Sequence, residues 1–105
     1  MKKRGRVDAN QKAVTSALRR IGCSVISLAS VGDGCGDILV GFRKRNWLLE
    51  IKDGSKPPSK RKLTPDQVIF HSTWQGQINI VCSPLEAIQL VSENGFSDKS
   101  FAWQG

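Results

Sequence analysis

Three charged residues interrupt two apolar segments whose composition is otherwise that of buried strands. Asp37 lies at the start of the segment 36–40, and Glu50 and Lys52 lie at the end of the segment 47–52. Because successive side chains of a strand point to opposite faces, Glu50 and Lys52 are predicted to share one face, opposite the apolar side chains. Burying a charge is costly without a partner, so each of these three groups is expected to face one.

The three residues can partner one another. If the two segments pair as a hairpin connected through residues 43–46, Asp37 lies beside Glu50. Two carboxylates brought together repel and raise each other's pKa, unless a divalent cation or an ammonium group offsets the charge. Lys52 is placed to supply the ammonium group, and Mg²⁺ would supply more positive charge. The sequence therefore predicts a cation site between two neighbouring strands.

An Asp that opens one strand, followed by Glu-x-Lys on the next, resembles the signature of the PD-(D/E)xK nuclease superfamily. Within it, the chain resembles the small stand-alone VRR-NUC (virus-type replication-repair nuclease) proteins of phages and prophages. The resemblance covers residues 6–91 and extends beyond the short catalytic motif. Its other parts are Asn10-Gln11 on an opening helix, the segment 31–34, Glu50-Ile51-Lys52-Asp53, Leu63-Thr64 before a helix, and Trp74 at the end of that helix.

The resemblance implies a metal-dependent nuclease that hydrolyses phosphodiester bonds in DNA. Asp37, Glu50 and the backbone carbonyl of Ile51 are expected to hold Mg²⁺ or Mn²⁺, which prefer oxygen ligands. Lys52 is expected to orient the attacking water and to balance charge at phosphorus. The resemblance further implies a structure-specific endonuclease that acts as a homodimer. Its substrate would be branched DNA, such as Holliday junctions or flaps.

Two polar side chains leave two interpretations open. Gln67 either only completes a capping box with Thr64 or also reaches the catalytic residues, as its counterpart does in the resembling family. Asn10 falls within the apolar face of the opening helix, so its amide bonds either a buried backbone group or the active site. His71 is expected to be a packed or surface histidine rather than a general base.

The net charge of +7 is unevenly distributed, with +10 in residues 1–62 and −3 in residues 63–105. Such asymmetry indicates an anionic polymer as partner. The alternative is that the basic residues are only solvated loops. Beside a metal site, we predict DNA contact by two clusters: Lys56, Lys60, Arg61 and Lys62, and Arg43, Lys44 and Arg45.

The order of predicted elements is helix, three strands, helix, strand, helix. Strands are expected at 24–29, 36–40, 47–52 and 77–82, and helices from about residue 9 to 21, from 65 to 74, and from 84 to 94. Between the third strand and the second helix, residues 53–62 are predicted to form a flexible basic loop. This αβββαβα order predicts an α/β fold with a restriction-endonuclease-like central mixed sheet flanked by helices.

Length and composition predict a single domain over residues 1–105, with a basic tail at 1–6 and a C-terminal tail at 96–105. The resemblance implies that this is a VRR-NUC-like nuclease domain. In the C-terminal tail, Phe101 and Trp103 are expected either to pack into the core or to form a dimer contact. No apolar run approaches the roughly 20 residues that span a bilayer, so no membrane partner and a cytoplasmic location are expected, in a bacterial host if the phage-type resemblance holds. Three cysteines without a Cys-x-x-Cys pair, and one histidine, argue against a zinc site.

A rival interpretation comes from a different class of protein. The chain could be a non-catalytic nucleic-acid-binding module that retains the nuclease fold and its basic surface. Substitution of Lys52 distinguishes the two, since a nuclease would then lose cutting and keep binding.

Overall fold

The computed structural model describes residues 9–97, and side chains as far as residue 92. The basic tail at 1–6 and the tail residues Phe101 and Trp103 lie outside the described residues. The chain forms helices α1 (Ala9–Arg20), α2 (Pro65–Thr73) and α3 (Pro84–Ser97), and strands β1 (Ser24–Ser27), β2 (Ile38–Phe42), β3 (Arg45–Ile51) and β4 (Asn79–Val81).

These strands form one mixed sheet in the order β1-β2-β3-β4. The pairs β1–β2 and β2–β3 are antiparallel, and β3 pairs with β4 in parallel. The predicted element order and the mixed sheet are therefore confirmed. No helix within residues 9–97 has both the length and the apolar content needed to cross a bilayer.

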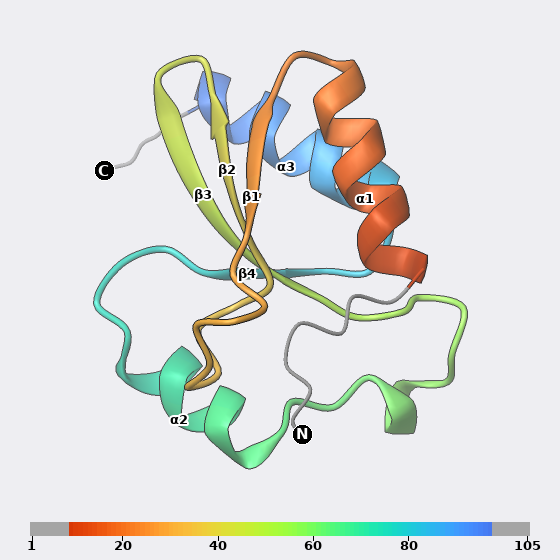
Figure 1. Cartoon of the computed structure of the whole chain (residues 1–105), viewed down its shortest axis with the longest axis vertical. Helices are drawn as coiled ribbons and strands as arrows, with labels where there is room; N and C mark the ends of the chain where they lie inside the picture. Colours follow the sequence, from red (N-terminus) through yellow and green to blue (C-terminus); the bar gives the residue numbers. More distant parts are fainter. Residues whose placement is uncertain (1–8, 98–105) are drawn as a thin grey trace.

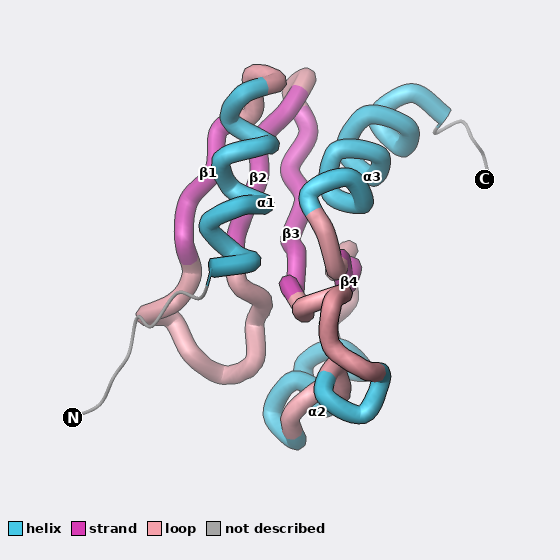
Figure 2. Tube along the Cα trace, turned by 90° about the vertical axis from the view of Figure 1, so that its right-hand side faces the viewer, coloured by secondary structure: helices cyan, strands magenta, loops and turns pink. Residues whose placement is uncertain are grey.

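The helices divide into two groups, as Figures 1 and 2 show. Helices α1 and α3 lie together on one side of the sheet and enclose the hydrophobic core, whereas α2 lies beyond the end of the strands. The core takes its side chains from alternate strand positions and from the facing sides of α1 and α3; it includes Val14, Leu18, Ile38, Val40, Leu49, Ile51, Val81, Ala87 and Val91. Helix α2 has no buried residue.

Several element ends differ from the predicted ones. Strand β1 ends at Ser27 rather than residue 29, and α2 ends one residue before Trp74, which is its C-cap. Helix α3 continues through Asn94 and Gly95 to Ser97, because a weak helix former lowers helix stability without forbidding the conformation. The predicted tail thus begins later than residue 96.

Strand β4 is shorter than predicted because a side chain replaces part of its backbone hydrogen bonding to β3. The Gln77 side chain accepts a hydrogen bond from the Leu48 amide at 2.7 Å and donates one to the Leu48 carbonyl at 2.8 Å. The Gln77 amide thereby satisfies the β3 backbone groups that a longer β4 would have paired. Backbone pairing begins only at Asn79, opposite Leu49.

The β2–β3 hairpin has a tighter connection than the predicted 43–46. Phe42 pairs with Arg45, which leaves only Arg43 and Lys44 in the turn. Both have positive φ values, 54° and 68°, as a type I′ turn requires. Glycine and asparagine adopt this backbone region at low cost, whereas arginine and lysine do so with strain.

We expect Lys44→Gly to stabilise the protein by roughly 0.5 to 1 kcal/mol, because glycine relieves left-handed backbone strain. Lys44→Ala is the matched control, since it removes the same charge without relieving the backbone. Thermal unfolding of the two variants checks this. A gain in Tm for the alanine variant as large as that for the glycine variant would contradict the assigned turn.

Candidate active site

The register of the hairpin brings Asp37 against the strand that carries Glu50. The Asp37 amide donates to the Leu49 carbonyl at 2.8 Å, which extends the β2–β3 pairing past Ile38. The Asp37 carboxylate then accepts a hydrogen bond from the Ile51 amide at 2.6 Å. Asp37 is therefore bound to the residues on both sides of Glu50.

Glu50 is almost completely buried, with only 2% of its surface exposed. Its Oε2 accepts a hydrogen bond from Gln67 Nε2 at 2.9 Å and lies 3.7 Å from Lys52 Nζ. Its Oε1 is also buried, yet no hydrogen-bond partner for it is present among the described residues. One oxygen of Glu50 is thus neutralised by its neighbours and the other is left available.

The environment of Glu50 raises its pKa to about 8. Burial is the largest cause, and the adjacent Asp37 carboxylate is the next, while Lys52 acts in the opposite direction. Asp37 contributes to the raised pKa through its charge and through a side-chain hydrogen bond, so the two carboxyl groups lie close together. Folding therefore brings like charges together at a point where the protein alone compensates them incompletely.

Gln67 combines the two roles that the sequence left as alternatives. Its Oε1 accepts from the Thr64 amide at 2.9 Å and so completes the capping box at the start of α2. The same oxygen accepts from Lys52 Nζ at 2.9 Å, and its Nε2 donates to Glu50. One amide therefore caps α2 and holds the lysine and the glutamate of the Glu-x-Lys motif together.

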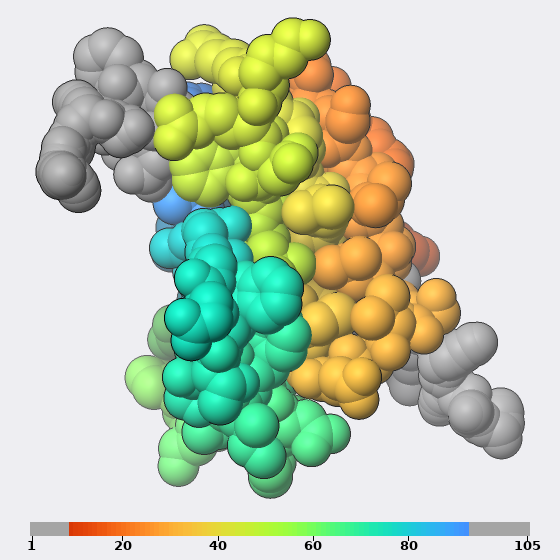
Figure 3. Space-filling model, turned by 90° about the vertical axis from the view of Figure 1, so that its left-hand side faces the viewer, coloured from red at the N-terminus to blue at the C-terminus, as the bar shows by residue number. Residues whose placement is uncertain are grey.

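A small pocket opens onto this cluster. It has a volume of about 160 Å³ and is lined by residues from the segment 28–36 together with Asp37, Glu50 and Gln67. The segment passes so close to α2 that a Cβ added at Gly34 would lie 2.6 Å from the Asp66 carbonyl oxygen. Figure 3 shows α2 (teal) directly against this segment (gold), so the two together form the wall of the pocket.

Asn10 supports the site through the backbone. Its Nδ2 donates to the carbonyl oxygen of Lys52 at 2.7 Å and lies 3.5 Å from that of Cys82. The first of the two interpretations of Asn10, a bond to a buried backbone group, is therefore the one that the structure contains. The bond fixes the end of β3, from which the Lys52 side chain projects.

The donor set suits a hard divalent cation. Asp37 and the unpartnered Oε1 of Glu50 offer carboxylate oxygens beside the end of β3, where the Ile51 carbonyl lies. Within the described part of the chain, no group of three or more His, Cys, Asp and Glu side chains could hold a metal. Among the described residues, an ion here would therefore have two carboxylates as ligands, those of Asp37 and Glu50.

Comparison with known proteins agrees with this geometry. No family model and no curated protein matches the sequence. A solved structure described as a "VRR_NUC domain" matches with a TM-score of 0.57 and 25% sequence identity, over 78% of this chain and 89% of that one. The chain resembles the VRR-NUC family in both fold and sequence. It therefore has a nuclease fold, as the resemblance implied.

One residue of the chain lies closer to the site than the sequence indicated. His71 Nε2 is 4.0 Å from Glu50 Oε1, and both atoms are buried without a hydrogen-bond partner among the described residues. Burial, and then the charge of Lys52, lower the pKa of His71, so the ring is neutral at pH 7. The sequence feature that could have indicated this proximity is the position of His71 four residues after Gln67, on the same side of α2.

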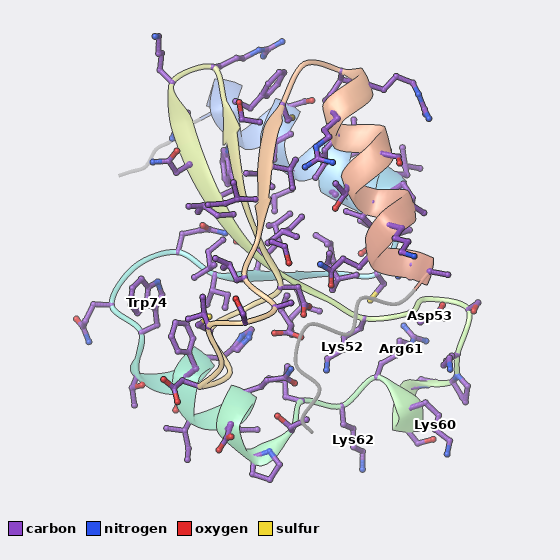
Figure 4. The ribbon with its side chains drawn as sticks, viewed as in Figure 1. Lys52, Asp53, Lys60, Arg61, Lys62 and Trp74 are labelled. Carbon is purple, nitrogen blue, oxygen red and sulfur yellow. The ribbon has the colours of Figure 1, made fainter. Side chains whose placement is uncertain are left out.

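The two basic clusters lie at different ends of the molecule. Lys56, Lys60, Arg61 and Lys62 belong to the segment between β3 and α2, near Lys52 (Figure 4). This segment is more structured than the predicted flexible loop, because it contains a 3₁₀ turn (Pro58–Lys60) and a 2.8 Å bond from Arg61 Nε to the Lys56 carbonyl.

Arg43, Lys44 and Arg45 lie at the tip of the β2–β3 hairpin, at the end of the strands opposite Asp37. Six residues of extended chain separate Arg43 from Asp37, a distance of about 20 Å. The guanidinium groups of this cluster are held over rings, Arg43 over Phe42 and Arg45 over Trp47. DNA contact by either cluster stays a prediction.

Glu50→Gln is expected to stabilise the metal-free protein at alkaline pH. Between pH 4.5 and 8 the folded protein retains a proton on Glu50 that the unfolded chain has released, so stability is greatest below this window and falls as the pH rises through it. The glutamine amide stays neutral and keeps an acceptor for Gln67. Urea unfolding should therefore show a gain on the order of 2 kcal/mol at pH 8.5 and a smaller one at pH 5. A gain independent of pH would contradict the raised pKa.

Gly34→Ala is expected to displace α2 from the pocket, because the added methyl group meets the Asp66 backbone. Gly32→Ala is the matched control: φ is positive at both glycines, +71° and +83°, but nothing lies within 4 Å of a Cβ at Gly32. Both variants should lose about 1 kcal/mol through backbone strain, and Gly34→Ala at least 1 kcal/mol more. Hydrogen exchange should show faster exchange in α2 for Gly34→Ala alone; equal exchange in the two variants would contradict the close contact.

Proposed function

We propose that this VRR-NUC domain is a Mg²⁺- or Mn²⁺-dependent nuclease that hydrolyses phosphodiester bonds in DNA. The observation that carries the proposal is the convergence of Asp37 and Glu50, with one buried Glu50 oxygen unpartnered and Lys52 3.7 Å from the other. Structural packing alone gives no reason to place two carboxylates side by side in the end of a sheet. A divalent cation does, because it offsets their repulsion.

Asp37, Glu50 and the Ile51 carbonyl would hold a single ion, with water completing its coordination. When bound, the ion supplies positive charge to the scissile phosphate and makes a water molecule more acidic. A second ion would have no carboxylate from α1, because residues 9–20 contain no Asp or Glu.

Lys52 is the catalytic residue that the chain itself contributes to charge balance. Its ammonium group donates to Gln67 and faces Glu50, so it is held beside the site where negative charge develops on the phosphate. Gln67 positions both groups, since it bonds each of them directly. Asn10 acts further back, through the Lys52 backbone.

The substrate and the assembly extend the same proposal. The cluster at Lys56, Lys60, Arg61 and Lys62 lies next to the site and would bind backbone phosphates, and the hairpin cluster would bind a second arm of a branched DNA. Val68, Ile69 and Trp74 are exposed by 51%, 61% and 48% and provide an apolar surface on and beside α2 for a second copy. We therefore extend the proposal to a single-domain protein that acts as a homodimer on junctions or flaps, which would use both basic clusters and the apolar surface. The proposed location is the cytoplasm of a bacterial host.

Cleavage of a panel of linear, flapped, splayed and four-way DNA in Mg²⁺ or Mn²⁺ tests the function. The wild type should cut a branched substrate, and Glu50→Gln and Lys52→Ala should each reduce the rate at least 100-fold. Sedimentation under the same conditions reports the dimer. Lys62→Ala is the matched control, since it removes one lysine near the site and should weaken binding without abolishing cutting.

Metal binding is measured on the same proteins without DNA. Mn²⁺ should raise the Tm of the wild type and leave that of Glu50→Gln unchanged. A wild type that binds DNA, does not respond to Mn²⁺ and cuts none of the panel would establish the rival function, a non-catalytic nucleic-acid-binding module.

A further inference from the structure

A second hollow lies between α1 and the edge strand β1, on the side of the sheet that faces the helices. Its volume is about 350 Å³, and its polar lining includes Lys12, Thr15, Ser16 and Arg19 of α1 and Ser27 of β1. None of the predicted DNA-binding residues belongs to it. We refer to this hollow as the α1 groove.

The α1 groove has the chemistry of a phosphate-binding surface. It offers two cations and three hydroxyl groups, and no Asp or Glu lines it. Lys12, Thr15, Ser16 and Arg19 have the spacing of one continuous stripe along a helix. Arg19 is fixed there, because its Nη2 donates to the Val25 carbonyl at 3.0 Å while its other N–H groups leave the guanidinium further donors.

The α1 groove ends where the active-site pocket begins. Ser27 pairs with Ile38 in the sheet, and both residues line the groove. The next pair is Leu28 and Asp37, joined by a 2.9 Å bond from the Leu28 amide to the Asp37 carbonyl, and both of these line the pocket. The two hollows are therefore lined by consecutive residue pairs at the end of the sheet.

The length of the stripe indicates what it can hold. Arg19 lies seven positions after Lys12, which corresponds to a rise of about 10 Å along the helix. This equals about three nucleotides of one strand at 3.4 Å each. Hydroxyl and cationic groups are common ligands of sugar-phosphate oxygens, and no aromatic side chain lines the groove to stack on bases.

We propose that the α1 groove binds the backbone phosphates of the DNA strand on one side of the scissile bond, over about three nucleotides. This inference rests on the proposed function, because it takes the active-site pocket as the place where the strand is cut. It assigns to α1 a substrate contact that is distinct from both basic clusters and independent of base sequence.

Charge reversal at Lys12 tests the proposal, with Arg20→Glu as the matched control. Both side chains are exposed on α1, but only Lys12 lines the groove. In a Lys52→Ala background, fluorescence anisotropy with labelled splayed DNA should show about tenfold weaker binding for Lys12→Glu and less than twofold for Arg20→Glu. Ser16→Glu, a second exposed position in the groove, should behave like Lys12→Glu. Equal effects of Lys12→Glu and Arg20→Glu would overturn the proposal.

A length series locates the bound strand. DNA is shortened one nucleotide at a time from the 5′ or the 3′ side of the branch point, and the Lys12→Glu penalty should disappear in one series after about three nucleotides are removed. A penalty that persists in both series overturns the proposal.

The proposed function fails separately from this inference. A wild type that binds but never cuts would refute the nuclease while the Lys12 and Arg20 comparison still judges the groove. A wild type that cuts, with Lys12→Glu indistinguishable from Arg20→Glu, would refute the groove alone.

Discussion

The constraint on which the rest of the structure depends is the register that forces Asp37 and Glu50 together. The tight turn at Arg43 and Lys44 sets this register, and the bond from Ile51 to Asp37 holds its far end. The resulting like-charge pair is partly buried, and Lys52 and Gln67 offset only one side of it.

Two separate parts of the fold meet at this pair. The sheet, α1 and α3 form the hydrophobic core, and they fix the positions of Asp37, Glu50 and the Lys52 backbone. Helix α2 has no buried residue and is attached through Gln67, through the close approach of Gly34, and through its chain connections. Gln67 therefore joins the two parts through polar bonds, since it bonds the Thr64 amide at the start of α2 and the side chains of Lys52 and Glu50 at the end of the sheet.

Much of the fold and the charged centre of the site could be predicted from the sequence. Alternation in residues 47–52 located the buried and charged faces of β3, and the cap Thr64-Pro65-Asp66-Gln67 located α2. The remainder depended on contacts between distant residues. The Gln77 side chain that replaces part of β4, the approach of His71 to Glu50, and the groove between α1 and β1 follow from tertiary packing, which periodicity does not encode.

The sparse attachment of α2 has a consequence for how the molecule opens. Native proteins unfold locally in cooperative units whose stability follows their buried contacts. With little apolar surface to hold it, α2 forms a unit that can detach while the sheet, α1 and α3 remain folded. Detachment would expose Glu50 to water and release Lys52 from its acceptor. Heat or mild denaturant should then abolish the proposed cleavage activity before the sheet, α1 and α3 unfold.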